Sequence, residues 1–259
     1  MRRWTISATQ WVLREPDVAR AAARVAAAGY TAIELSADPD AGAGSLRRAT
    51  LDNGLDVTSL CTLWDAGRDC AHPDPAPRRA AREHLTRSAE LAGELGAAVV
   101  IVVPTYRTAP EDDRPSELAR AADTIAAVAA SIPAGGPALA IEALNRYETH
   151  LIRTLDDAEA LRAAIDHPQV RLMADLFHMQ LEEDDTPAAL RAHAGQLVHV
   201  HLADNQRREP GSGSLDFAAA FAALRDIGFA GALTMEFSPA TDAGLRAGRA
   251  HVERQAEAA

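Results

Sequence analysis

The sequence predicts an α/β fold in which eight parallel strands close into a single (β/α)8 barrel, a TIM barrel, spanning residues 1–259. Three observations support this prediction. Short apolar runs alternate along the chain with longer amphipathic stretches rich in Ala, Leu and Arg. Several of these stretches are followed by a glycine, as in Ile-Gly-Phe, which is typical of a helix C-terminus. No linker or low-complexity segment divides the chain.

The apolar runs define the expected strands. In chain order they are Trp4–Ala8, Ala32–Leu35, Val57–Leu60, Ala98–Val103, Ala138–Glu142, Val170–Asp175, Val198–Leu202 and Leu233–Phe237. Helical patterning between them is clearest over Asp17–Ala28, Arg78–Leu95, Glu117–Ala130, Leu155–Ile165 and Phe217–Ile227. The segment after Ala240 is expected to form the last helix. Such alternation favours a parallel sheet, because each crossover returns the chain through a helix.

An open, doubly wound sheet is the alternative arrangement. No Gly-x-Gly-x-x-Gly motif follows the first strand and no phosphate-binding loop is present, so this alternative has little support. Closure is also favoured by four polar residues at the ends of the last four strands. They are Glu142, Asp175, His201 and Glu236. A closed barrel brings these strand ends to one face, where the active sites of such barrels lie.

These four residues form a pattern that suits a divalent cation. They end the runs ALAIE, VRLMAD, LVHVH and ALTME and follow one another at intervals of about 30 residues, the length of one strand–helix–strand unit. Three carboxylates and one imidazole supply the oxygen-rich ligand set that hard divalent cations prefer. The alternative for each glutamate is a structural carboxylate paired with an arginine from a loop.

Four longer motifs contain these residues: IEALNRYETH, ADLFHMQLEEDD, HVHLADNQRREPGSGSLDF and TMEF. In them the chain resembles the xylose-isomerase-like barrel superfamily and, within it, the ketose 3-epimerases that act on D-tagatose and D-psicose. The resemblance is detailed from Ala138 to Phe237, whereas the first half is similar in layout only. It implies a metal-dependent ketose 3-epimerase that inverts C3 of a free ketose through a cis-enediolate.

The resemblance also implies roles for individual residues. A divalent cation, Mn²⁺ foremost but also Mg²⁺ or Co²⁺, would be bound by Glu142, Asp175, His201 and Glu236. The two glutamates would in addition act as the acid/base pair on opposite faces of the sugar. The O1/O2 end of the ketose would be held by Glu148, His178 and Arg207.

Some of these residues also have simpler interpretations. Glu148 could instead pair with Arg146 on the surface. His178 is expected in a loop, where it could merely pack. His199 shares a strand face with His201 but lies one layer deeper, which favours a buried, hydrogen-bonded imidazole over a fifth ligand. The substrate pocket is expected to be shaped by side chains that follow strands one to four, Trp11, Cys61, Trp64 and residues 104–107.

Three other functions remain open. An aldose–ketose isomerase of the hydroxypyruvate isomerase type is favoured by the Glu-Pro-Gly-Ser-Gly turn, which is similar to a turn of that group. However, that group is expected to have a His-x-Gln pattern where this chain has His199-Val200-His201. A lyase or dehydratase acting on a 3-keto sugar or inosose would use the same carbanion chemistry. A non-enzymatic binding barrel would have no need of the ligand set and the acid/base pair together.

Composition limits the partners. The formal net charge of −11 argues against nucleic acid or an anionic membrane as a main partner. No apolar run approaches the roughly 20 residues of a membrane span, and the N-terminus lacks a signal-peptide pattern. Cys61 and Cys70 are expected to be thiols. We therefore expect a cytoplasmic protein acting on a small sugar, and the resemblance implies a homodimer or homotetramer.

Overall fold

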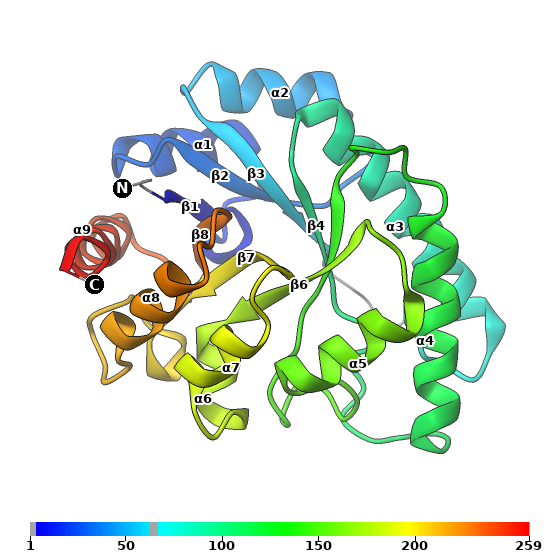
Figure 1. Cartoon of the computed structure of the whole chain (residues 1–259). Helices are drawn as coiled ribbons and strands as arrows, with labels where there is room; N and C mark the ends of the chain where they lie inside the picture. Colours follow the sequence, from blue (N-terminus) through cyan, green and yellow to red (C-terminus); the bar gives the residue numbers. More distant parts are fainter. Residues whose placement is uncertain (1–3, 63–66, 259) are drawn as a thin grey trace.

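The computed structural model describes residues 4–62 and 67–258, and within them parallel strands form a closed barrel in chain order from β1 to β8. The strands are β1 Thr5–Thr9, β2 Ala32–Ser36, β3 Asp56–Cys61, β4 Val99–Val102, β5 Ala138–Ile141, β6 Val170–Asp175, β7 Leu197–Leu202 and β8 Ala232–Met235. Figure 1 shows the helices outside the strands, with β1 and the last helix, α9, on the same side of the molecule. The predicted (β/α)8 barrel is confirmed, and each strand lies within two residues of its expected bounds.

The helices lie between the strands in the expected order. In the described part of the chain they are α1 Val18–Ala27, α2 Ala43–Leu51, α3 Pro75–Leu95, α4 Arg114–Ala129, α5 Leu155–Ile165, α6 Leu176–Glu182, α7 Thr186–Ala192, α8 Phe217–Asp226 and α9 Asp242–Ala258, with the 3₁₀ turns η1 Trp11–Leu13 and η2 Asn205–Arg207. The sequence pattern gave no bounds for α2, α6 or α7. All three are short, so an amphipathic repeat is difficult to recognise in them.

Aspartates begin most of the outer helices. Their side chains accept hydrogen bonds from backbone N–H groups of the first turn, and they are Asp17 of α1, Asp74 of α3, Asp113 of α4, Asp185 of α7 and Asp216 of α8. Part of the negative charge of the chain therefore lies at helix N-termini, where the aspartates cap the helix and interact favourably with its dipole.

The barrel interior changes from apolar to polar along the strands. Ala140, Met173 and Ile101 belong to a small buried apolar cluster that is separate from the main core between strands and helices. Side chains two positions apart on a strand point to the same side. The residues two positions after Ala140 and Met173 are Glu142 and Asp175, so the layer nearest the C-terminal ends of these strands is acidic.

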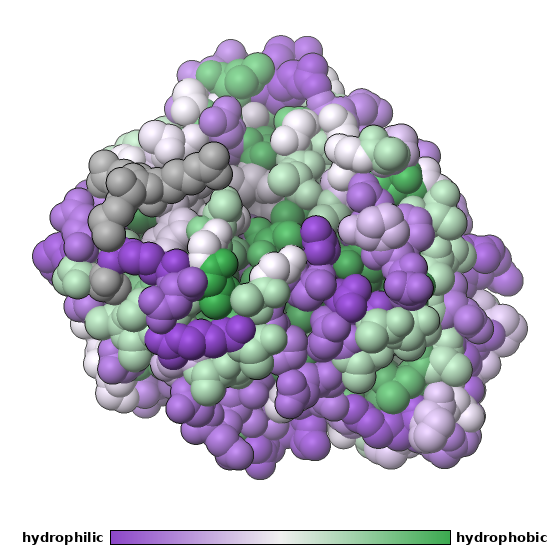
Figure 2. Space-filling model, in the orientation of Figure 1, coloured by the Kyte–Doolittle hydropathy of each residue, from purple (hydrophilic) through white to green (hydrophobic). Residues whose placement is uncertain are grey.

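The outer surface is mixed in character. Figure 2 shows hydrophilic residues over most of one face, with smaller apolar areas between them. None of the described helices combines the length and apolar character that crossing a bilayer requires. Both cysteines are buried free thiols, as expected.

Candidate metal centre

Four buried side chains meet at the C-terminal ends of β5, β6, β7 and β8. They are Glu142, Asp175, His201 and Glu236, each of which offers a ligand atom within 4.8 Å of the others. Asp175 and His201 face each other in the β6–β7 register. The two glutamates lie just past their strands, but their N–H groups still donate to Val102 and Leu202, so strand geometry holds them. The structure thus brings together the four residues expected at one face.

Local hydrogen bonds leave ligand atoms free to face this cluster. Asp175 ends β6 and begins α6, and its Oδ1 accepts from the N–H of Phe177 at 2.7 Å. Its Oδ2 makes no hydrogen bond within the described residues. His201 Nδ1 likewise makes none, although it lies 3.2 Å from Glu236 Oε2 and 3.7 Å from Glu142 Oε1. Buried polar atoms without partners are costly, so this donor set fits a bound cation.

The electrostatics of the cluster favour a positive charge. Burial raises the pKa of Glu142, and the nearby Glu236 and Asp175 carboxylates raise it further. Burial also opposes the charged form of His201, but Glu236 and Glu34 outweigh it and raise its pKa well above the usual value. Burial opposes the charged form of Asp175 too, but His178 and Arg207 outweigh it and lower its pKa to about 2. The imidazole therefore holds a proton when no cation is bound, and a divalent cation would replace that proton.

Arg207 lies against the cluster. One guanidinium nitrogen, Nη2, bonds Glu236 and lies 3.7 Å from Asp175 Oδ2. The other, Nη1, lies 3.2 Å from His178 Nε2 and 3.6 Å from Glu148 Oε1. The guanidinium also lies 4.9 Å from the centre of the Phe177 ring. Because an arginine stays protonated, Arg207 places a fixed positive charge beside the carboxylates of the cluster.

His178 lies in a helix, and its expected place in a loop was wrong. It belongs to the first turn of α6, and its side chain is buried. Its Nδ1 accepts hydrogen bonds from the backbone and side-chain nitrogens of Asn145. The ring proton is consequently assigned to Nε2, 3.4 Å from Asp175 Oδ2.

Glu148 faces Arg207, and the alternative pairing with Arg146 does not occur. Arg146 binds Glu182 from α6, through both its backbone N and its side chain. Glu148 accepts a hydrogen bond from Asn145 at 3.0 Å. It therefore lies at the edge of the same cluster, and Asn145 connects it to His178.

The sequence profile of the xylose isomerase-like TIM barrel family matches residues 22–255. The chain belongs to this family. It is 31% identical to the L-ribulose 3-epimerase of Mesorhizobium japonicum over 237 residues, which cover 90% of this chain and 78% of that protein. It is also 31% identical to the 3-dehydro-D-guloside 4-epimerase of Escherichia coli over 199 residues, or 74% of this chain and 75% of that protein. A solved L-ribulose 3-epimerase structure matches with a TM-score of 0.91 at 27% identity, over 99% of this chain and 95% of that chain. The resemblance to ketose 3-epimerases is thereby confirmed.

The sequence pattern did not identify Glu34 as a residue of the site. Its carboxylate is fully buried on β2. Its Oε2 accepts hydrogen bonds from Ser59 at 2.7 Å and His201 Nε2 at 3.1 Å, and it lies 2.9 Å from His199 Nε2. Burial disfavours the charged form, but the two histidines outweigh it and lower its pKa. Because Nε2 of His201 bonds Glu34, Nδ1 is the nitrogen that faces the other carboxylates. The lone Glu within the apolar run AIELS was the available signal.

His199 is a buried imidazole bonded to Glu34, as its deeper position predicted. Cys61 is buried at the end of β3, and the pKa of its thiol is raised by burial and by Glu34, Glu236 and Glu142. Trp64, another expected pocket residue, lies outside the described residues. Trp11 lies near Arg207, whose guanidinium is 5.9 Å from its ring centre.

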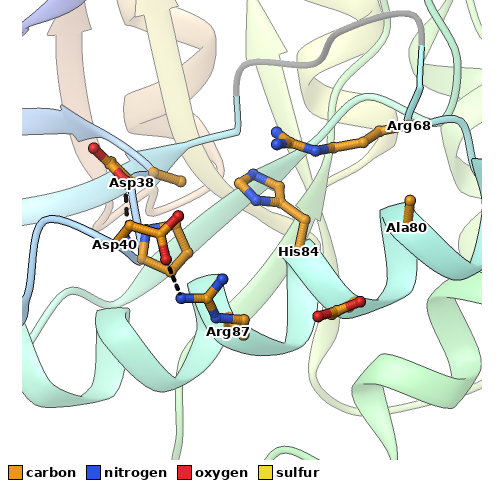
Figure 3. Close-up of a pocket in the computed structure, with 9 residues that line it drawn as sticks. Asp38, Asp40, Arg68, Ala80, His84 and Arg87 are labelled. Carbon is orange, nitrogen blue, oxygen red and sulfur yellow. Dashed lines mark hydrogen bonds and ion pairs between the residues drawn. The ribbon is translucent and has the colours of Figure 1, made fainter.

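A separate pocket of about 440 Å³ lies outside the barrel, between the segment after β2 and helix α3. Figure 3 shows Asp38 and Asp40 on one side of it and His84 and Arg87 on the other. Arg87 bonds Asp40 at 2.6 Å. None of the four ligand candidates lines this pocket, so it belongs to a different part of the surface.

Proposed function

We propose that the chain is a metal-dependent ketose 3-epimerase that inverts C3 of a free ketose. The observation that carries this proposal is the buried cluster in which Glu142 and Glu236 both approach His201 Nδ1 while Arg207 lies against it. Sugar-epimerase activity is further supported by the named relatives, which act by inverting a carbon centre of a sugar. Isomerase and lyase activities are not favoured by these relatives.

The cation would be held by the buried cluster, which comprises Glu142, Asp175, His201 and Glu236. Mn²⁺ is our first choice, with Mg²⁺ and Co²⁺ as alternatives, because three carboxylates and one imidazole suit all three. When bound, the ion supplies positive charge that polarises the ketone and makes the adjacent C–H more acidic.

The chain's own residues would then carry out two proton transfers at C3. One glutamate removes the proton at C3, the electrons move into the C2–C3 bond and the ketone oxygen, and an enediolate forms. The other glutamate returns a proton to the opposite face of C3, which inverts the centre. Arg207 would donate to the oxygen on which negative charge develops. His178 and Glu148 would hold the O1/O2 end of the sugar.

The test is incubation with Mn²⁺ and a panel of free ketohexoses and ketopentoses in D₂O, with the position of deuterium read by NMR. Deuterium at C3 together with the epimerised ketose is the expected result. Deuterium at C1 with an aldose product would instead indicate an isomerase. Absence of exchange on every free ketose would exclude the proposed substrate class.

A 4-epimerase acting on a 3-keto glycoside is the second candidate. It is favoured by the 31% identity to the 3-dehydro-D-guloside 4-epimerase of E. coli, which covers 74% of this chain. The same residues could move a proton at C4, because C4 is also adjacent to a ketone at C3. Deuterium at C4 of a 3-keto glycoside, with none at C3 of free ketoses, would select this function.

We also propose a cytoplasmic location and a homodimer or homotetramer. Cell fractionation and light scattering of the purified protein test these two statements.

Replacement of Arg207 by alanine is expected to raise KM and lower kcat together. The variant loses the donor next to Glu236, and the loss of one such donor typically lowers kcat by about 10²–10³-fold. Steady-state kinetics on the best ketose measures the effect. Arg208→Ala is the matched control, because the neighbouring Arg208 is exposed. An unchanged kcat/KM in Arg207→Ala would exclude the proposed role.

Replacement of Glu34 by glutamine is expected to weaken Mn²⁺ binding by about 10–100-fold, the usual effect of losing a partner of a ligating histidine. Glutamine has one acceptor oxygen where Glu34 bonds His201 and Ser59 and approaches His199. Calorimetric titration of the metal-free protein measures the affinity. Glu117→Gln is the control, because buried Glu117 also bonds a histidine, His150, but lies outside the cluster. Equal affinities in the two variants would contradict the prediction.

A further inference from the structure

The loop between β7 and α8 holds Arg207 in an unusual backbone conformation. Gln206 and Arg207 both have positive φ angles, 58° and 55°. Two consecutive residues with side chains in the left-handed region are uncommon, and such a conformation persists only where surrounding contacts enforce it. Some other part of the loop must therefore hold these residues in place.

Asp204 makes the required contacts. This residue is buried, and its carboxylate accepts backbone N–H groups from both sides of the loop. Oδ1 accepts from Asn205 at 2.9 Å and from Leu215 at 3.1 Å. Oδ2 accepts from Gly211 at 3.0 Å and from Gly213 at 2.9 Å. Burial raises the pKa of Asp204, but these four hydrogen bonds outweigh it and hold the pKa below its usual value.

The Pro-Gly-Ser-Gly turn is shaped to fit this carboxylate. A Cβ on Gly213 would lie 2.3 Å from Asp204 Oδ1 and 1.9 Å from Asn205 Oδ1, which no real side chain permits. Gly211 has a φ of 90°, and a Cβ there would lie 2.4 Å from His251 Nδ1. Both glycines thus allow their N–H groups to approach Asp204 closely. The turn has no direct part in the proposed reaction; its N–H groups bind the Asp204 carboxylate.

Backbone hydrogen bonds connect Asp204 to the guanidinium. The N–H of Asp204 donates to the carbonyl of Arg208 at 2.8 Å, which closes a small loop with Arg207 near its tip. The carbonyl of Arg207 accepts from the N–H of Ser238 at 2.8 Å, two residues after Glu236. The side chain then extends over Phe177 to Glu236. The loop, the end of β8 and the start of α6 together fix the direction of Arg207.

We propose that Asp204 is the positioning residue of Arg207: through four backbone N–H groups it holds the loop in the left-handed conformation that points the guanidinium at the site. The expected loss of kcat/KM rests on the proposed function. The position of Arg207 does not, because it can be measured without substrate. Asp204 has no contact with the reacting atoms and acts through Arg207 alone.

Asp204→Asn is the principal variant. Asparagine has nearly the same shape, but one carboxylate oxygen becomes an NH₂ group that cannot accept from two N–H donors. We expect kcat/KM to fall by about 10²-fold, the effect of a misplacement of roughly 1 Å in a catalytic group. Mn²⁺ should still bind, because none of the four hydrogen bonds of the Asp204 carboxylate involves a ligand candidate. Asp216→Asn is the matched control, because Asp216 ends the same loop but only caps α8.

A double-mutant cycle separates positioning from general stability. In the Arg207→Ala background, Asp204→Asn is expected to change kcat/KM less than about threefold, since there is no guanidinium left to position. An equal loss in both backgrounds would overturn the inference. Should Asp204→Asn fail to fold, Gly213→Ala disturbs the same carboxylate and must give the same non-additive result.

The Nε–H resonance of Arg207, assigned by its disappearance in Arg207→Lys, gives a readout without substrate. The Nε atom is buried, so its proton should exchange slowly. We expect the resonance to shift and broaden in Asp204→Asn and to stay unchanged in Asp216→Asn. An unchanged resonance in Asp204→Asn would overturn the positioning role. An unchanged kcat/KM in Arg207→Ala would instead remove the function proposed for Arg207 while leaving this test valid.

Discussion

Replacing Glu142 or Glu236 with glutamine will abolish inversion at C3 and leave the fold intact. Glutamine keeps the shape and one ligand oxygen of each side chain but cannot accept a proton. Loss of a positioned acid or base typically costs about 10²–10⁴-fold in rate, and here each turnover requires both groups. Incubation in D₂O with Mn²⁺, followed by NMR of the ketose, measures inversion and deuterium at C3 together.

Two controls connect this loss to proton transfer. Glu182→Gln alters a carboxylate of α6 that bonds Arg146 outside the cluster, and it should retain full activity. Calorimetry should show Mn²⁺ bound to both cluster variants, which separates loss of a base from loss of a ligand. Inversion that persists in either cluster variant, with metal bound, would refute the two-base mechanism.

The strands and the four cluster residues could be predicted because both depend on local sequence. A buried parallel strand reads as a short apolar run, and its last residue faces the catalytic side of a barrel. The runs that end in Glu142, Asp175, His201 and Glu236 needed no further information. The start of helix α6 was not recognised, because its N-cap residue, Asp175, is also the last residue of β6. The sequence pattern had assigned Asp175 only to the strand end and to the metal site.

The roles of Glu34 and Asp204 could not be predicted because each depends on how the folded chain places its hydrogen-bond partners. Glu34 bonds a histidine 167 positions away, across the barrel interior. Asp204 is close in sequence to its partners, but its role depends on the left-handed turn that brings four N–H groups to one carboxylate. Neither contact has a periodic signature. Each residue supports a neighbour that the motif already contained, His201 in one case and Arg207 in the other.

Removal of the metal is expected to lower both activity and thermal stability. Without a cation, three buried carboxylates lie within one small volume, and Arg207 and the His201 imidazole are the positive groups beside Glu236. A ligand at about 100 times its Kd stabilises the native state by about 2.7 kcal/mol, which raises Tm by roughly 5–10 °C in a chain of this size. Calorimetric melting of chelator-treated protein, with and without added Mn²⁺, measures the shift.

The pH dependence of this stabilisation has a definite sign. In the metal-free protein the pKa of His201 is raised well above its usual value by Glu236 and Glu34, so the imidazole is protonated at neutral pH. Mn²⁺ must displace that proton, and its affinity should therefore rise with pH by about tenfold per unit for each proton released. Asp175→Ala removes one ligand oxygen and should show almost no Mn²⁺-dependent change in Tm at any pH. Binding that weakens as pH rises, or a full Tm shift in Asp175→Ala, would mean that the cation binds elsewhere.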